Sequence, residues 1–383
     1  MTVSANPGAA GMNVDPTMLM GGGSTGRQIV ITSVAILLGL LVGAILIIVS
    51  GLIGPDQTFD PTLPFTAYGA LLEGALGGPR PIANTLNATS PLIFAGLSVA
   101  FGFRAGLFNI GANGQFLVGA FCAAIVGASL GLPFPIAAIA AIAAGALGGA
   151  LWGFIPGLLK AWRGAHEVVT TIMLNSTAYL LLNLLASGAF KDPVATFPRT
   201  PDIQPGATLG VILADTRLHV GIFIAIATAF AVWFLLFKST LGFEIRTVGA
   251  NASAARYAGI RPGLITVLTM SIAGGLAGVG GGVEILGITK NYPAEFLVNY
   301  GFDGIAVALL GRVHPIGVIG GALLFGIMRA GASSMQRATD IPVDIISIVQ
   351  GVILLFVAAQ VVIEHLLPRM RARRRDPAAA AVA

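Results

Sequence analysis

The chain has 383 residues, of which 56% are hydrophobic and 10% are charged, and its mean hydropathy is +0.89. Soluble domains carry about 25% charged residues, so this composition excludes a soluble globular protein and predicts an integral membrane protein. The formal net charge is +5, and the tail after Leu367 holds five arginines. The basic balance therefore indicates cytoplasmic retention of loops and tail rather than nucleic-acid binding.

Long runs of Ala, Leu, Ile and Val together with 52 glycines predict an all-α, polytopic bundle of membrane helices. A membrane β-barrel would instead alternate apolar and polar residues in segments of about ten. We expect residues 1–27 to form a disordered cytoplasmic lead, residues 28–367 the transmembrane domain and residues 368–383 a basic cytoplasmic tail.

The apolar runs predict about ten membrane segments, of which eight to ten cross completely. Basic residues between the segments place both termini in the cytoplasm. Tyr300–Leu310 is too short for the roughly 20 residues of a span, so a half-helix or re-entrant piece is expected there. Whether residues 107–132 and 300–310 cross completely is left open. In chain order the runs are Ile29–Ile53, Ile82–Phe103, residues 107–132, Phe134–Leu159, Val168–Ala186, Val220–Phe237, Gly263–Ile288, Tyr300–Leu310, Pro315–Ala332 and Ile345–Leu366.

Two regions place helix-breaking and polar residues in apolar surroundings. The first is Phe101–Gln115, and the second comprises Leu276–Gly287 and Asn299–Asp303. Irregular backbone at membrane depth occurs where it is buried in protein or lines a cavity, and paired breaks indicate a translocation path. Close helix packing is the alternative for Gly278–Gly282, and hydrogen bonds between helices are the alternative for the amides. The candidate path residues are Asn109, Asn113, Gln115, Asn175, Glu284 and Asp303.

The segment 238–262 is the longest polar interruption that also carries clustered basic residues. Asn251 is a good N-cap, Ala252–Ala258 favours a helix, Gly259 suits a left-handed residue after it, and Pro262 blocks continuation. A helix of about two turns does not persist in water without support. The pattern predicts a docking element for a soluble partner, with an ordinary loop that only fixes topology as the alternative.

The sequence lacks the patterns of several chemistries. It has no Walker motif, its four histidines are scattered, and Cys122 is its one cysteine. There is no serine nucleophile motif and no convincing carboxylate pair. We therefore predict no enzyme activity, no bound cofactor and no metal site.

Four segments carry a family resemblance: Phe103–Gln115, His166–Asn175, Leu241–Ile260 and Gly301–Gly326. Together they make the chain resemble permease subunits of bacterial ABC importers in the branched-chain amino acid and simple-sugar family. It is most similar to the nucleoside and simple-sugar branch.

The resemblance implies a multi-pass permease of the bacterial plasma membrane that moves a nucleoside or simple sugar inward. ATP and Mg²⁺ would be bound by a separate ATPase subunit. The implied partners are that ATPase, a second permease, an extracytoplasmic substrate-binding lipoprotein, membrane lipid and a small polar solute, with no nucleic acid. A branched-chain amino acid permease and an ion-coupled secondary transporter that depends on Glu284 or Asp303 are the alternatives.

Leu241–Ile260 matches the loop that contacts the ATPase in this family. The resemblance also leads us to expect an acidic residue where this chain has Asn113. The residues expected to couple the chain to its ATPase are Glu244, Arg246, Gly249, Asn251, Ala255, Arg256, Tyr257 and Gly259.

Overall fold

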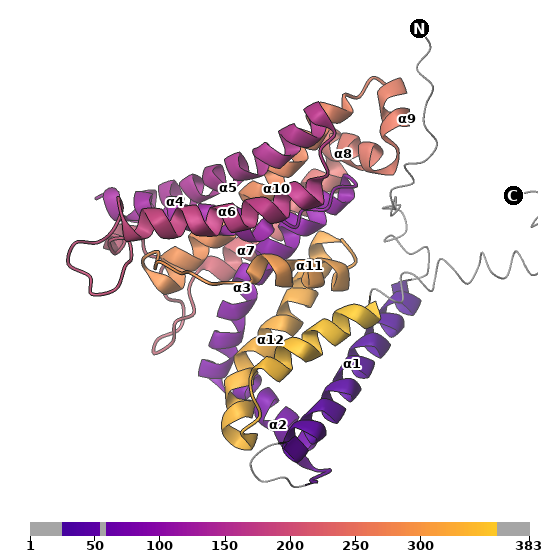
Figure 1. The fold of residues 1–383 in the computed structure, drawn as a ribbon, viewed down its shortest axis with the longest axis vertical. Coiled ribbons are helices and arrows are strands. Elements are labelled where there is room, and N and C mark those ends of the chain that lie inside the picture. Colours follow the sequence, from indigo (N-terminus) through magenta and orange to yellow (C-terminus); the bar gives the residue numbers. More distant parts are fainter. Residues whose placement is uncertain (1–24, 54–58, 358–383) are drawn as a thin grey trace, which may run out of the picture.

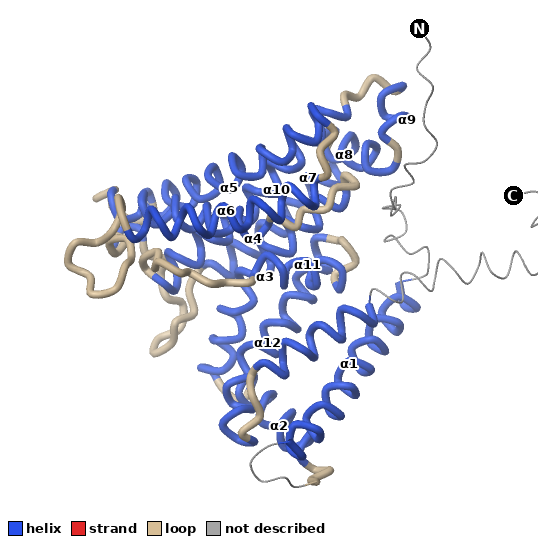
Figure 2. Tube along the Cα trace, in the orientation of Figure 1, coloured by secondary structure: helices blue, strands red, loops and turns tan. Residues whose placement is uncertain are grey.

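A computed structural model describes residues 25–53 and 59–357, and its regular elements there are helices, with two isolated β-bridges (Figures 1 and 2). This confirms the predicted all-α bundle. The helices are α1 (Thr25–Ile53), α2 (Leu63–Leu76), α3 (Pro79–Arg104), α4 (Ala112–Ser129), α5 (Ile136–Arg163), α6 (Glu167–Ser187), the 3₁₀ turn η2 (Pro205–Ala207), α7 (Gly221–Lys238), α8 (Thr240–Ala250), α9 (Ala252–Tyr257), α10 (Pro262–Glu284), the π-turn η3 (Ile285–Thr289), α11 (Tyr300–Leu310), α12 (Pro315–Thr339) and a helix over Asp344–Val357.

Within the described residues, eight helices are long and apolar enough to cross a membrane. One of them is α4, in one of the two segments whose crossing was left open. Helix α11 has 11 residues and rises about 16 Å, roughly half of the hydrocarbon core, as expected for a half-helix. Thr25–Arg27 already belong to α1, whereas the rest of the predicted lead and the whole basic tail lie outside the described residues.

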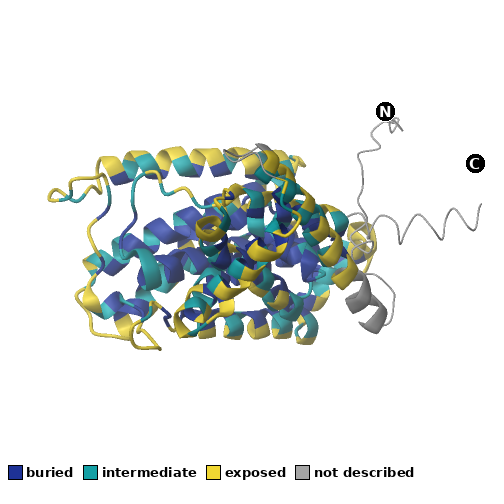
Figure 3. Ribbon diagram, turned by 90° about the horizontal axis from the view of Figure 1, so that it is seen from below, coloured by how far each residue is buried: buried dark blue, intermediate teal, exposed yellow. Residues whose placement is uncertain are grey.

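Helix α3 lies at the centre of the bundle. In its most apolar window 83% of the residues are buried, compared with 17% for α6 at the periphery. It contacts α7 and α10 on one side and α11 and α12 on the other. Figure 3 shows the buried residues gathered in the middle and the exposed ones on the outer helices. Helix α3 therefore connects the helices α7 and α10 to the helices α11 and α12.

Helices α5 and α10 pack backbone against backbone. A Cβ atom added at Gly278 would collide with the carbonyl oxygen of Gly145, and one at Gly274 with that of Gly149. Small residues allow such close approach between membrane helices. The predicted break at Leu276–Gly287 is therefore wrong for its first nine residues, because the glycines there keep their helical hydrogen bonds and serve packing.

The break in the second half of the chain lies at residues 290–299, between η3 and α11. It follows a π-turn, a form often found at functional positions in helices. The predicted break at Asn299–Asp303 is wrong for its last four residues, because these form the first turn of α11 and only Asn299 precedes the helix.

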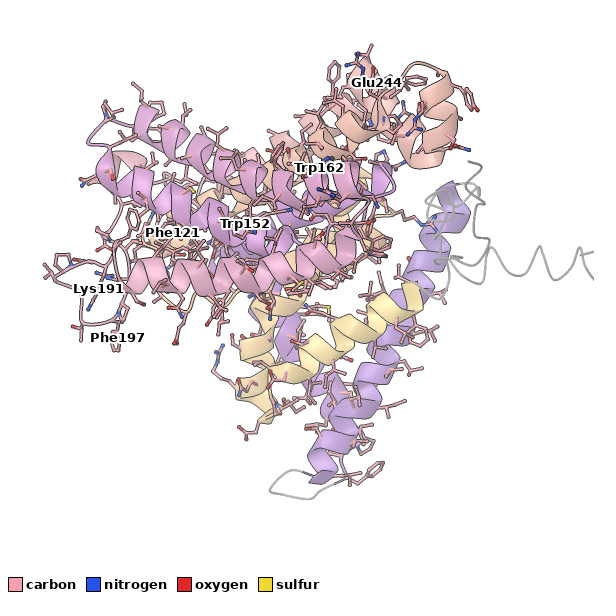
Figure 4. The ribbon with its side chains drawn as sticks, turned by 45° about the horizontal axis from the view of Figure 1, so that its top comes forward. Phe121, Trp152, Trp162, Lys191, Phe197 and Glu244 are labelled. Atoms are coloured by element: carbon pink, nitrogen blue, oxygen red, sulfur yellow. The ribbon has the colours of Figure 1, made fainter. Side chains whose placement is uncertain are left out.

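The two ends of the bundle differ in character. Figure 4 shows Glu244 of α8 at one end, beside α9, and Lys191 and Phe197 at the opposite end of the long helices. The latter belong to the long loop after α6, which is tied to residues 290–292. Thr200 N donates to the carbonyl of Tyr292 at 2.9 Å, and Asn291 Nδ2 donates to Asp202 Oδ1 at 2.8 Å.

Candidate functional site

The short helix α9 is capped at its N-terminus by Asn251. The backbone N–H groups of Ser253 and Ala254 both donate to Asn251 Oδ1 at 2.9 Å. Two of the helix's otherwise unpaired N–H groups are thereby satisfied, which stabilises a helix by about 1 kcal/mol. The helix start predicted at Ala252 is the one observed.

The C-terminus of α9 ends in a Schellman motif. Gly259 has φ +83°, its N–H donates to Arg256 O, and Ile260 N–H donates to Ala255 O, both at 3.0 Å. This 5→2 and 6→1 pattern terminates a helix with glycine in the left-handed conformation. Ala255 is fully buried, whereas Tyr257 is 95% exposed. The helix is thus fastened through one small side chain and presents the rest of its surface outward.

Helix α8 supports α9 and is anchored to the bundle. Arg246 lies over the ring of Phe237 at 5.3 Å and donates to Gly242 O. A Cβ added at Gly249 would collide with the carbonyl oxygen of Arg104. Of the expected coupling residues, Arg246 and Gly249 therefore contact the bundle, Glu244 is half-buried, and Arg256 and Tyr257 are exposed beside the caps.

Arg104 connects this region to the turn between α11 and α12. Its Nε donates to the carbonyl of Val313 at 2.8 Å, and its guanidinium lies over Phe237 at 5.1 Å. The Phe237 ring in turn stacks with His314 at 5.4 Å. Arg312 and Val313 both have positive φ, a strained backbone conformation for such residues. One arginine therefore joins the end of α3, the end of α7 and the turn that leads into α12.

The first break contains a buried pair of amides. Asn109 Nδ2 donates to Gln115 Oε1 at 2.8 Å and to Ser98 Oγ at 3.1 Å, and Gln115 Nε2 donates back to Asn109 Oδ1. Both side chains are almost completely buried. The pair holds the loop before α4 against α3, so these amides make contacts between helices.

Asn175 and Asn113 tie the start of α4 to its neighbours. Asn175 on α6 accepts from Gly114 N at 2.8 Å and donates to Ile110 O at 2.9 Å. Asn113 Oδ1 accepts from Gly301 N at 3.2 Å. The N-termini of α4 and α11, which follow the two breaks, therefore meet inside the bundle.

The candidate acids Glu284 and Asp303 belong to a separate cluster. The Tyr300 hydroxyl donates to Glu284 Oε1 at 3.5 Å, and Arg329 Nη1 lies 3.4 Å from Asp303 Oδ2. The Arg329 guanidinium also lies 4.5 Å from the centre of the Tyr300 ring. The structure thus separates the six candidate path residues into four amides that bond neighbouring segments, of which Asn113 is half-buried and the other three are buried, and two acids in a charged cluster.

Tyr300 and Arg329 are functional candidates that the sequence interpretation did not include. Arg329 lies well inside the apolar helix α12. A charged side chain inside a membrane span is by itself a functional signal, so this residue was recognisable from the sequence. Tyr300 carried no comparable signal, because its neighbours in the fold come from α10 and α12.

A cavity of about 690 Å³ opens beside this cluster. It lies between α11, α12 and the helix Asp344–Val357, and this volume is in the range typical of small-molecule sites. Its polar lining residues are Asn299, Asp303, Arg329, Ser333, Ser347 and Gln350, with Phe302 among the apolar ones. Within the described residues, no group of three or more His, Cys, Asp or Glu is arranged to hold a metal.

A bundle of apolar helices with one half-helix, a cavity lined partly by polar residues and an exposed capped helix at one end is compatible with a membrane transport subunit. The chain belongs to the family described as branched-chain amino acid transport system / permease component, which matches residues 81–358. It is therefore a multi-pass membrane permease of an ABC transporter and not an enzyme. Membership implies ATP use by a partner ATPase and a substrate-binding partner.

Curated relatives match over most of the chain. The guanosine ABC transporter permease protein NupP of Bacillus subtilis is 38% identical over 90% of this chain and 97% of the relative. The nucleoside ABC transporter permease protein NupB of Lactococcus lactis is 34% identical over 92% and 96%. The glucose ABC transporter permease protein TsgB13 of Haloferax volcanii is 33% identical over 76% and 80%. No solved structure matches. The predicted family is confirmed. Because this family belongs to the ATP-dependent transporters, the alternative of an ion-coupled secondary transporter is dropped.

Proposed function

We propose that this chain imports a nucleoside as one permease of an ABC importer. The observation that carries the choice of solute is the 38% identity to a guanosine permease over 97% of that relative's length. The cavity agrees with this solute, because amides, hydroxyls and the two aromatic rings of Phe302 and Phe325 line it and its Arg329 is paired with an acid. A simple sugar is the second candidate, favoured by the similarity to a glucose permease.

The proposed partners are a cytoplasmic ATPase that holds ATP and Mg²⁺, a second permease, identical or homologous, and an extracytoplasmic binding lipoprotein. Supporting the second permease, the guanosine permease protein NupQ, from the same Bacillus subtilis strain as NupP, is also 31% identical to this chain. We expect α9 to dock on the ATPase, with Glu244, Arg256 and Tyr257 nearest to it.

We expect the motion to pass from α9 to the cavity through side chains already in contact. ATP-driven closure of the ATPases would pull α9 and, with it, the anchored helix α8. Gly249 and Arg246 of α8 contact the Arg104–Phe237 pair, and Arg104 holds the carbonyl of Val313 at the end of α11. Coupling of this kind requires a rigid lever and a bundle with two arrangements, not a catalytic residue.

The test is uptake by proteoliposomes that contain the complete importer. With ATP inside and the binding protein outside, tritiated guanosine should accumulate, and a non-hydrolysable ATP analogue should abolish this. Glucose and leucine, supplied in parallel, should accumulate far less. Accumulation of glucose or leucine without guanosine would overturn the nucleoside assignment, and guanosine uptake that needs no ATP would overturn the mechanism.

A further inference from the structure

The cavity bounded by α11, α12 and Asp344–Val357 has a lining suited to one class of solute. Among its described lining residues, Asp303 and Arg329 are the two that carry formal charge, and they lie 3.4 Å apart. Their side chains remain 30% and 41% exposed. The pair therefore keeps hydrogen-bonding capacity toward the cavity, where a guanidinium donates and a carboxylate accepts. Neighbouring hydroxyls on a sugar can use both at once.

Phe302 supplies a flat apolar surface in the same cavity. It is 46% exposed and follows Tyr300 and Gly301 near the start of α11. Any nucleobase stacks favourably on an aromatic ring, because every base has a π-face. The amide of Gln350 and the hydroxyls of Ser333 and Ser347 provide donors and acceptors for a neutral ligand.

The charges in the cavity lining are balanced. Among the described lining residues, the acid Asp303 pairs with the base Arg329, whereas Glu284 contacts Tyr300, is 8% exposed and does not line the cavity. A phosphate group brought to this site therefore meets no unpaired positive charge there and must compete with Asp303 for the Arg329 guanidinium.

We propose that this cavity binds an uncharged nucleoside, with Phe302 against the base and the Arg329–Asp303 pair on the ribose hydroxyls, and that it rejects nucleoside phosphates because Asp303 already occupies Arg329. The inference rests on the proposed function and adds a location and a selectivity to it. It makes Phe302, Asp303 and Arg329 residues that determine specificity.

The test is photolabelling of the complete importer in nanodiscs with 8-azidoadenosine, followed by identification of the labelled peptides. Label on this chain is expected in residues 297–306 or 343–354. Adenosine should protect these peptides at concentrations about ten-fold lower than adenosine 5′-monophosphate. Label confined to other segments, or equal protection by the monophosphate, would overturn the proposal.

Two variants sharpen the result. Phe302→Leu should reduce labelling of these peptides by about ten-fold. Phe230→Leu on α7, where the ring is 53% exposed, should leave the labelling unchanged. Asp303→Asn should let the monophosphate protect nearly as well as adenosine, because Arg329 then lacks its acidic partner, and Asp303→Ser replaces this variant if it does not assemble. Equal labelling of Phe302→Leu and wild type would contradict the stacking role.

The labelling and uptake experiments separate the two proposals. If guanosine is imported with ATP but the label lies elsewhere, the cavity assignment fails and the proposed function stands. If wild-type importer carries no nucleoside, the proposed function fails whatever the labelling pattern.

Discussion

Gly259 has a conformation that few other residues adopt without strain. Its φ of +83° is unfavourable for a β-branched side chain by about 1–3 kcal/mol, and a helix of six residues has little stability of its own to offset this cost. We expect Gly259→Val to distort the end of α9. ATP hydrolysis by the assembled importer should persist while guanosine uptake falls by about ten-fold, measured in the same proteoliposomes.

Gly210→Val is the matched control, because Gly210 lies in a loop at the opposite end, has no positive φ and has open space around it. It should retain normal uptake. Normal uptake by Gly259→Val, at normal membrane abundance, would remove the coupling role from α9.

The burial of His219 leads us to expect that the protein is less stable in acid. His219 is buried before α7, its Nδ1 accepts from Gly221 N at 3.1 Å, and Nε2 is buried with no partner among the described residues. Burial and the nearby charge of Lys290 lower the pKa of His219 from 6.5 to about 4. Between these values the unfolded chain binds a proton that the folded chain does not, so the free energy of unfolding falls as pH decreases.

The expected loss between pH 7 and pH 4 is at most about 3 kcal/mol. His219→Asn keeps an acceptor for Gly221 but does not titrate, so its apparent Tm should fall less between these pH values. The measurement is a thermal-shift series of both proteins in detergent. Parallel pH curves would show that His219 does not contribute.

At this scale the sequence predicted the caps of α9, whereas for the amides it left solute contact and helix contact as alternatives. Asn251 and Gly259 act through backbone groups within a few residues, and such local chemistry can be read from the chain. Asn109 and Gln115 look equally suited to solute or structure, and only the fold shows that they bond each other. The contact of Arg329 with Asp303 joins two helices, so its partner was not predictable from spacing.

Among the elements, the α5–α10 pair depends on glycines that leave no room for a side chain. We expect Gly278→Ala to force the helices apart, because its Cβ would meet the backbone of Gly145. Overpacking of this kind costs about 1–3 kcal/mol. The apparent Tm should fall by about 5 °C, measured by size-exclusion chromatography after heating.

Gly320→Ala is the control, since Gly320 of α12 has no heavy atom within 4 Å of an added Cβ. It should leave the Tm unchanged. An equal Tm for the two variants would contradict the packing role of Gly278.

The existence and order of the apolar helices were predictable because composition determines what enters a bilayer. The continuity of α10 was not. A cluster of glycines is compatible with a broken helix and with a close helix contact, and the choice depends on the facing glycines of α5, which lie more than a hundred positions earlier in the chain.

Across the whole molecule, Arg104 contacts both the end of α7, on which α8 is anchored, and the turn between α11 and α12. Arg104→Gln removes the charge over Phe237 and the Nε donor to Val313 O. We expect guanosine uptake to fall by about ten-fold while ATP hydrolysis continues, because α8 and the α11–α12 turn no longer move together. Arg104→Lys should retain part of the uptake through its charge.

Arg80→Gln removes an exposed arginine from the other end of α3 and should transport normally. If Arg104→Gln also transports normally at equal abundance, motion must reach α12 by another route.

The glycine contact between α5 and α10 also restricts how the permease changes shape. Carbonyl oxygens that face opposing Cα atoms leave no layer of flexible side chains to absorb sliding, so these two helices should travel as a unit. Helices α11 and α12 make contacts of the same kind elsewhere, because a Cβ added at Gly304 would meet the backbone of Ala95 in α3 and one at Gly331 the carbonyl oxygen of Leu71 in α2. The third wall of the cavity, Asp344–Val357, instead meets α1 mainly through the side chains of Val349 and Ile353. We therefore expect the cavity to change shape by displacement of Asp344–Val357, while α5 and α10 keep their contact.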